Sequence, residues 1–197
     1  MFKNFIKKLK IHYGLYGAIL TAVCAILIFV DLLTKFLEEK YAWKFWHDVK
    51  AINWLIYVES GHRNDGAAFS SFAGNQTFLI IITVLMLAAL IVTFLLTPNR
   101  FQILKIAIVM IISGAIGNLV DRIMFQEVRD FVWINIFGNF ACCNFADFWI
   151  VLGAILAAVD IMFLNELALI PLTKKAKEAQ KKEREKDLNN SENGTEE

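Results

Sequence analysis

Long apolar segments separated by shorter polar stretches dominate this chain. Four of them approach the roughly 20 residues that an α-helix needs to cross a bilayer, and they span residues 13–30, 78–96, 101–120 and 148–170. The first is closed by Asp31 and the third ends at Asp121, while the fourth carries Asp160 and Glu166. The pattern predicts a mainly α-helical membrane protein with four transmembrane helices.

Composition supports this interpretation and limits the number of domains. Of the 197 residues, 57% are hydrophobic and 20% are charged, whereas soluble domains average about 45–50% and about 25%. We therefore expect residues 1–173 to form a single membrane domain. Residues 174–197 are polar throughout, and we expect them to form a charged cytoplasmic tail that is partly disordered. The net charge of +1 gives no indication of a nucleic-acid partner.

Lysine and arginine residues are distributed unevenly between the two sides of the predicted bundle. The N-terminus, the turn 97–105 and the tail together carry thirteen, whereas the loops 38–77 and 121–147 together carry six. Because cytoplasmic segments carry the excess of positive charge, we expect both termini in the cytoplasm and both long loops outside. The first loop contains aromatic and β-branched runs, AWKFW and INWLIYV, which favour a small β-rich extracytoplasmic region or an interfacial layer.

Charged and amide side chains gather at the predicted outer ends of the helices. They are Asp31 and Lys35 after the first span, Asn118, Asp121 and Arg122 at the end of the third, and Asp130, Asn144 and Asp147 before the fourth. Placing polar groups at membrane depth is unfavourable in free energy, so a structural or catalytic role is needed to explain the cluster. It is either an ion-pair network that fixes the helix ends or a pair of carboxylates for acid–base chemistry. The spacing alone leaves both interpretations open.

Four sequence blocks resemble those of the lipoprotein signal peptidases (signal peptidase II), which are bacterial membrane aspartyl proteases. The blocks are DLLTK from Asp31, NDGAAFS from Asn64, SGAIGNLVDR from Ser113, and VRDF from Val128 together with CNFAD from Cys143. They follow the family's order and fall on the expected elements, over roughly residues 13 to 170. Each block alone is a weak signal, but four in matching topology are specific.

The resemblance assigns roles to the clustered polar residues. It implies that Asp130 and Asp147 form the catalytic dyad and that Asp121 is a supporting residue. It also implies a set that lines or supports the substrate pocket, namely Asn64, Gly66, Asn118, Arg122, Asn144, Asp31 and Lys35. The chain departs from the family pattern at Ser113, where the family has Gly, and at Cys143, where it has Phe. Neither departure touches the dyad, so both bear on packing.

The activity that the resemblance implies is hydrolysis of a peptide bond at the outer face of the bacterial cytoplasmic (inner) membrane. The substrate would be a prolipoprotein with a diacylglyceryl-modified cysteine, surrounded by membrane lipid and cut on the N-terminal side of that cysteine. Paired carboxylates need no metal or organic cofactor, so none is expected. The alternative is a small membrane transporter or a non-catalytic helper subunit, with carboxylates that handle protons or ions. That alternative predicts acidic residues at mid-membrane, where only Asp160 fits.

Two charged residues lie deeper within the predicted spans. Asp160 follows Asp147 by 13 residues and Lys105 precedes Asp121 by 16, which places them about 20 Å and about 24 Å from the outer face. We expect the two side chains to pair, directly or through water. The alternative is that each extends separately to the cytoplasmic interface.

Overall fold

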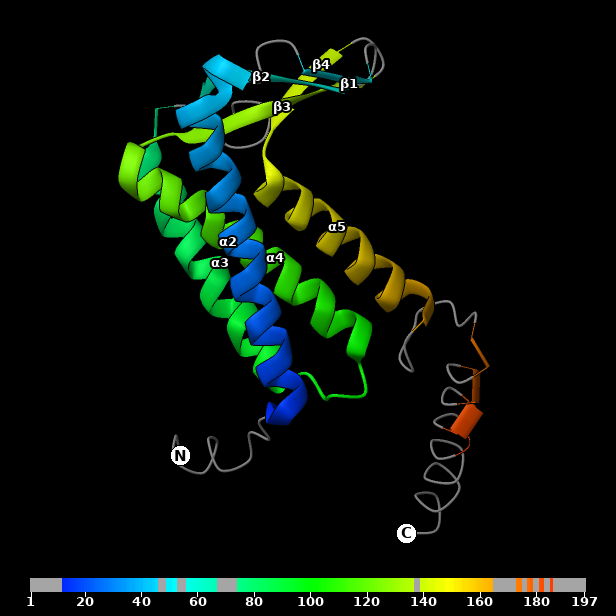
Figure 1. Ribbon diagram of the computed structural model, residues 1–197. Helices are drawn as coiled ribbons and strands as arrows, with labels where there is room; N and C mark the ends of the chain where they lie inside the picture. Colours follow the sequence, from blue (N-terminus) through cyan, green and yellow to red (C-terminus); the bar gives the residue numbers. More distant parts are fainter. Residues whose placement is uncertain are drawn as a thin grey trace.

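The computed structural model describes residues 12–45, 49–52, 56–66, 74–136 and 139–164, with a few positions between 173 and 185. Four long helices form a bundle, and a small antiparallel sheet covers one end of it (Figure 1). All four helices are long and apolar enough to cross a membrane, which confirms the predicted fold class. The expectations for residues 1–11, for Glu166 and for most of the tail 174–197 fall outside the described residues.

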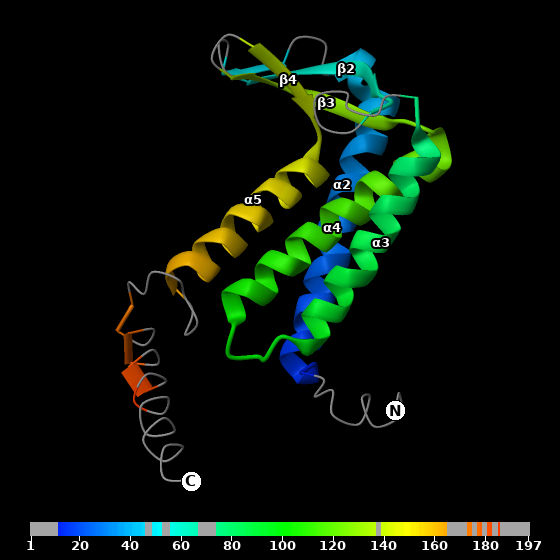
Figure 2. The ribbon, with the colours of Figure 1, turned by 180° about the vertical axis from the view of Figure 1, so that it is seen from behind.

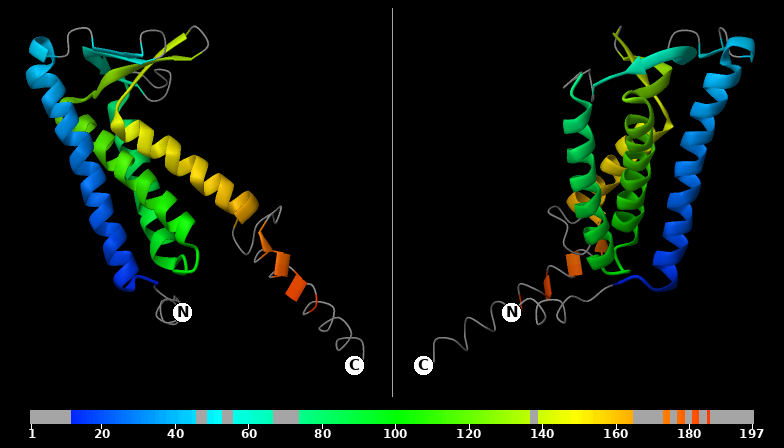
Figure 3. Two further views of the ribbon diagram at one scale, coloured as in Figure 1. Left: turned by 45° about the vertical axis from the view of Figure 1, so that its right-hand side comes forward. Right: turned by 90° about the vertical axis from the view of Figure 1, so that its left-hand side faces the viewer.

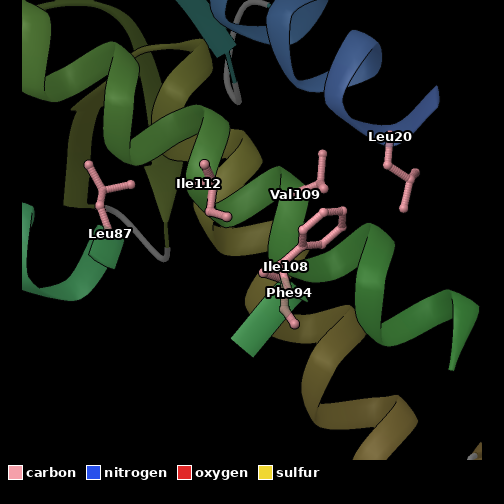
Figure 4. Packing of buried hydrophobic residues seen from close by; sticks show 6 residues of the cluster. All are labelled: Leu20, Leu87, Phe94, Ile108, Val109 and Ile112. Atoms are coloured by element: carbon pink, nitrogen blue, oxygen red, sulfur yellow. The ribbon is translucent and has the colours of Figure 1, made fainter. Parts of the chain in front are cut away.

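The helices pack through a core of apolar side chains and present other apolar side chains outward. They are α2 (Gly14–Phe45), α3 (Gln76–Leu96), α4 (Gln102–Phe125) and α5 (Phe145–Val159), the last continued by the π-helix η2 (Asp160–Leu164). Figure 4 shows the core cluster contributed by α2, α3 and α4, which contains Leu20, Leu87, Phe94, Ile108, Val109 and Ile112. Outward-facing side chains such as Leu15, Leu85 and Met124 are largely exposed, as a lipid-facing surface requires.

Two helices continue past the charged residues at which the sequence predicted their ends. Helix α2 runs beyond Asp31 to Phe45, and α4 runs beyond Asp121 to Phe125. These predicted ends were wrong because the charges are matched inside the fold: Lys35 lies one turn after Asp31 and approaches its Oδ2 to 2.9 Å. Most of the AWKFW run therefore belongs to α2, and neither to a strand nor to a separate interfacial layer.

The sheet is built from both of the long loops that were predicted to lie outside, and not from the first loop alone. Its strands lie in the order β1 (Val49–Ile52), β2 (Ile56–Asn64), β3 (Val128–Ile136) and β4 (Asn139–Cys143). The predicted β-rich region is confirmed for β1 and β2, whereas β3 and β4 were missed. In the central pairing, His62 lies opposite Asp130, Arg63 opposite Arg129 and Asn64 opposite Val128. This register places the end of β2, from the first loop, beside the start of β3, from the second loop.

Glycines allow α4 to approach α5 and α2 closely. A Cβ atom on Gly114 would lie 2.2 Å from the carbonyl oxygen of Ala146, and one on Gly117 would lie 2.3 Å from Asp31 Oδ2. Real Cβ atoms do not make contacts this short, so only glycine fits at either position. The sheet-proximal halves of α2 and α4 and the start of α5 therefore meet below the sheet.

The remaining helix ends lie away from the sheet. The start of α2, the turn between α3 and α4, and the end of α5 are at the opposite end of the bundle, as the views in Figures 2 and 3 agree. There, Lys105 Nζ donates to the His12 carbonyl and, at 2.8 Å, to Asn99 Oδ1. Among the described residues, these two oxygens are the hydrogen-bond acceptors of Lys105 Nζ, and the expected direct pair with Asp160 is not found.

Candidate active site

The residues singled out in the sequence come from five elements and meet beneath the sheet. Helix α2 supplies Asp31 and Lys35, α4 supplies Asn118, Asp121 and Arg122, β2 ends with Asn64, β3 carries Asp130, and the junction of β4 with α5 supplies Asn144 and Asp147. Gly66 lies just beyond β2. Hydrogen bonds or ion pairs link every one of these residues to at least one other member of the set.

A reciprocal cap at the start of α5 fixes Asn144 and Asp147. Asn144 Oδ1 accepts a hydrogen bond from the backbone N–H of Asp147, and Asp147 Oδ2 accepts one from the backbone N–H of Asn144, each at 3.1 Å. Such a capping box satisfies backbone donors that a helix start leaves without intrahelical partners. The same two bonds that begin the helix therefore orient the Asp147 carboxyl group.

Asparagine side chains link the Asp130 and Asp147 carboxyl groups. Asn144 Nδ2 donates to Asp130 Oδ1 at 2.7 Å and to Asn118 Oδ1 at 3.1 Å. Asn118 Nδ2 in turn donates to Asp147 Oδ1 at 2.7 Å, and Asn64 Nδ2 donates to Asp130 Oδ2 at 3.0 Å. Each carboxyl group is thus held by an amide donor, and the two amides are bonded to each other.

The environment of Asp130 favours its protonated form. Burial and, next, the nearby charge of Asp147 raise the pKa of Asp130 from 3.8 to about 7, against the hydrogen bonds from Asn64 and Asn144, which lower it. With a pKa of about 7, the Asp130 carboxyl group carries its proton in a large fraction of molecules at neutral pH. Neither carboxyl group forms an ion pair with any cation that the structure describes.

A separate network of buried ion pairs lies next to this pair. Lys35 Nζ is 2.9 Å from Asp31 Oδ2 and 3.2 Å from Asp121 Oδ2, and all three side chains are inaccessible to solvent. Asp31 Oδ1 also accepts the backbone N–H of Ala146 at 2.9 Å, and Lys35 donates to Asn118 Oδ1 at 3.1 Å. The structure therefore contains both features that the spacing left open: an ion-pair network, and a pair of carboxyl groups outside it.

Asp121 has a cationic partner that the sequence analysis missed. Its neighbour in sequence, Arg122, points elsewhere, whereas Arg129 Nη2 lies 2.7 Å from Asp121 Oδ1. The backbone N–H of Arg129 also donates to Asp121 Oδ2 at 3.1 Å. Arg129 directly precedes Asp130 on β3 and is 7% exposed. Helical spacing does not predict this contact, because the chain leaves the helix at the left-handed C-cap residue Gln126 and turns back before Arg129 reaches Asp121.

Arg122 instead contacts the turn after β2. Its Nη2 donates to the Gly66 carbonyl oxygen at 3.2 Å, and the Gly66 N–H donates to Asn64 Oδ1 at 3.0 Å. The guanidinium group interacts electrostatically with Asp147, Asp130 and Asp121. Its buried Nε has no hydrogen-bond partner in the described part of the chain, so a donor remains beside the two carboxyl groups.

The two departures from the family pattern are accommodated without contact between their side chains and the pair. Ser113 Oγ donates to the Val109 carbonyl oxygen on its own helix at 2.7 Å. Cys143 Sγ lies 3.4 Å from the Val132 carbonyl oxygen on the neighbouring strand. Burial raises the pKa of the Cys143 thiol to about 12, so the thiol stays protonated near neutral pH.

Comparison with known proteins agrees with the resemblance of the four blocks. The family model described as Signal peptidase (SPase) II matches residues 23–163. The proteins named lipoprotein signal peptidase from Staphylococcus aureus strains JH9 and Newman are each 34% identical over 151 residues, which cover 76% of this chain and 90% of the relative. These findings do not favour a transporter or a helper subunit.

Two solved structures share the fold. Both are described as bacterial membrane enzyme structures obtained by the in meso method, one at 2.3 Å and one at 1.9 Å resolution. The first has a TM-score of 0.65 and 31% sequence identity, and covers 76% of this chain and 90% of its own. The second has a TM-score of 0.64 and 30% identity, and covers 78% of this chain and 97% of its own.

Proposed function

Because the chain belongs to the signal peptidase II family of aspartic-type membrane peptidases, we propose that Asp130 and Asp147 are the catalytic dyad with which it processes prolipoproteins. The reaction removes the signal peptide by hydrolysis of the peptide bond on the N-terminal side of a lipid-modified cysteine. The observation that carries this proposal is the pair of carboxyl groups bonded to the linked amides of Asn118 and Asn144.

The chemistry requires one proton on the pair. The ionised carboxylate accepts a proton from water, whose oxygen attacks the scissile carbonyl carbon, while the protonated carboxyl group donates to the carbonyl oxygen. The proton taken from water then passes to the departing amine as the C–N bond breaks. A pKa of about 7 for Asp130 beside Asp147 supports this arrangement, because the singly protonated pair is then well populated at neutral pH.

The surrounding residues supply binding and support in this proposal. Arg122 offers its free Nε to the substrate, and Asn64 and Gly66 form the adjoining wall of the pocket. Asn118 and Asn144 orient the dyad. Asp31, Lys35 and Asp121 hold the ends of α2, α4 and α5 together, because a buried lysine with two carboxylates is stable only while the charges stay matched.

We assign the site to the extracytoplasmic face of the bacterial cytoplasmic membrane, with both termini in the cytoplasm. The uneven distribution of lysine and arginine supports this orientation, as does the location of the sheet at the end opposite the start of α2 (Figure 1). A prolipoprotein anchored in the outer leaflet would reach the dyad at this depth, with its acyl chains in membrane lipid. The charged segment 174–197 is proposed as a cytoplasmic tail outside the peptidase domain 1–173.

A cleavage assay in vesicles tests the proposal with two prolipoprotein forms, one lipidated and one not. The wild type should cleave the lipidated form, seen as a gel shift, and should leave the other form intact. Asp130→Asn and Asp147→Asn should each abolish cleavage, because an amide cannot exchange the proton. Asp65→Asn is the matched control, since Asp65 is exposed, and should cleave at the wild-type rate. Full activity in either dyad variant at equal expression would overturn the assignment.

A further inference from the structure

Two arginines face each other across the sheet, beside the residues that hold the dyad. Arg63 on β2 lies opposite Arg129 on β3 in the register of the pairing. Arg63 directly precedes Asn64, which donates to Asp130, and Arg129 directly precedes Asp130 itself. Like charges directly opposite each other on neighbouring strands repel. The strands would therefore be pushed apart at the position where they bring Asn64 to Asp130.

A single carboxylate from α2 contacts both arginines. Glu39 Oε1 lies 3.0 Å from Arg63 Nη2, and Glu39 Oε2 lies 2.9 Å from Arg129 Nη1. Helix α2 reaches this position only because it continues past Asp31. Each oxygen of Glu39 thus binds a different strand, and the carboxylate joins α2, β2 and β3 at one point.

The other anions near the two arginines do not replace Glu39. Asp121 binds Arg129, at 2.7 Å, and shares its charge with Lys35. Glu127 contacts Arg63, and the distance to Arg63 Nε is 3.5 Å. Among the described residues, Glu39 is the carboxylate that bridges the facing pair. Its hydrogen bonds and those of Asp121 outweigh the effect of burial and raise the pKa of Arg129, so Arg129 stays charged.

We propose that Glu39 is a positioning residue for the dyad: it neutralises the facing Arg63 and Arg129 and so keeps Asn64 in contact with Asp130. This inference rests on the proposed catalytic role of Asp130. Glu39 does not act on the substrate, and its effect passes through the two arginines and the strand pairing to the Asn64–Asp130 hydrogen bond.

Loss of Glu39 should change the pH profile of the reaction, which loss of a merely stabilising contact would not do. The hydrogen bond from Asn64 lowers the pKa of Asp130, in opposition to burial and to Asp147. When β2 moves away, that contribution is lost and the pKa of Asp130 rises. Asp130 also faces Asn144 and Asp147 from the start of α5, Lys35 from α2 and Arg122 from α4, and Glu39 contacts none of these four. The limb of the pH–rate profile that reports the dyad should therefore move to higher pH.

The test compares Glu39→Gln with Glu39→Gln/Arg63→Gln in the full-length protein in vesicles. Glu39→Gln should lower kcat by about 10- to 100-fold with KM within about twofold, and should shift the dyad limb upward. The double variant removes the repulsion together with the carboxylate, so it should recover kcat to within about threefold of the wild type and restore the pH profile. Glu127→Gln is the matched control because Glu127 contacts Arg63 without bridging the pair, and its kcat should match the wild type.

Each outcome separates this inference from the proposed function. If Glu39→Gln fails to fold, the double variant should fold and cleave, since relief of the repulsion is the cause of rescue. Wild-type kcat in Glu39→Gln, or a double variant as impaired as the single one, would overturn the positioning role while leaving the function intact. A wild type that fails to cleave the lipidated substrate, or an active Asp130→Asn variant, would instead overturn the proposed function.

Discussion

Asn118 and Asn144 are hydrogen-bonded to each other through their side-chain amides, with Asn144 Nδ2 3.1 Å from Asn118 Oδ1. Asn118 comes from the C-terminal half of α4, and Asn144 caps the start of α5. Each amide also donates to one carboxyl group, Asn118 to Asp147 and Asn144 to Asp130. The helix cap and the orientation of the dyad therefore depend on the same buried side chain.

Substitution can separate the two roles of Asn144, which are to cap α5 and to orient the carboxyl groups. Serine caps helices almost as well as asparagine, but its hydroxyl group is too short to reach both the Asp147 N–H and the Asp130 carboxyl group. Both Asn144→Ser and Asn144→Ala lose the buried hydrogen bonds to Asn118 and Asp130, but Asn144→Ser should keep the cap, and it should lower kcat by about 100-fold or more. Asn144→Ala should lose similar activity and in addition about 1 kcal/mol of stability. Activity assays and thermal unfolding of both variants check this, and an active Asn144→Ser would contradict it.

The raised pKa of Asp130 predicts a specific dependence of stability on pH. With a folded pKa of about 7 against about 3.9 in the unfolded chain, the folded state binds more protons between these values. The stabilisation is therefore complete below about pH 4 and is lost as the pH rises through about 7, by up to about 4 kcal/mol. Asp130→Asn has no proton to lose, so its thermal midpoint should fall less than that of the wild type between pH 5 and pH 8. Thermal midpoints that change equally with pH in the two proteins would contradict the raised pKa of Asp130.

Gly117 should not tolerate a methyl group, although alanine is the better helix former by about 1 kcal/mol. A Cβ atom there would meet Asp31 Oδ2 at 2.3 Å and Ala146 Cβ at 3.2 Å. Gly117→Ala should displace Asp31 from Lys35 and from the start of α5, and should lower both the thermal midpoint and kcat. Ile123→Ala, on the exposed face of the same helix, is the control and should leave kcat unchanged. A Gly117→Ala variant as stable and active as the wild type would refute the close approach.

The charge distribution predicts the orientation in the membrane. A reporter that is active only in the cytoplasm should be active when fused at Glu197 and inactive when inserted after Asp65. Deletion of residues 181–197 should leave kcat within about twofold of the wild type, because the proposed orientation puts this segment on the other side of the membrane from the proposed site. A Glu197 fusion that is active only outside the cell would reverse the proposed orientation and remove the site from the outer face.

The sequence by itself determined the four membrane spans, since about 20 apolar residues in a row have few other stable locations. Through the resemblance of the four blocks it also indicated Asp130, Asp147 and their amide partners as the candidate site, although spacing alone left their role open. The membrane spans are local features, because the hydropathy of each segment expresses them fully.

Only the tertiary structure decided which charge meets which. Asp31 was expected to end a helix and instead lies within α2, because Lys35 and the N–H of Ala146 satisfy it. Asp121 pairs with Arg129 and not with Arg122, and Lys105 donates to His12 and Asn99. The pairing of β2 with β3, which places Arg63 opposite Arg129 for Glu39 to bridge, joins segments on either side of two membrane spans. Apart from the i,i+4 pair of Asp31 and Lys35, such contacts depend on which groups the packed chain brings within about 3 Å, which spacing along a single segment does not encode.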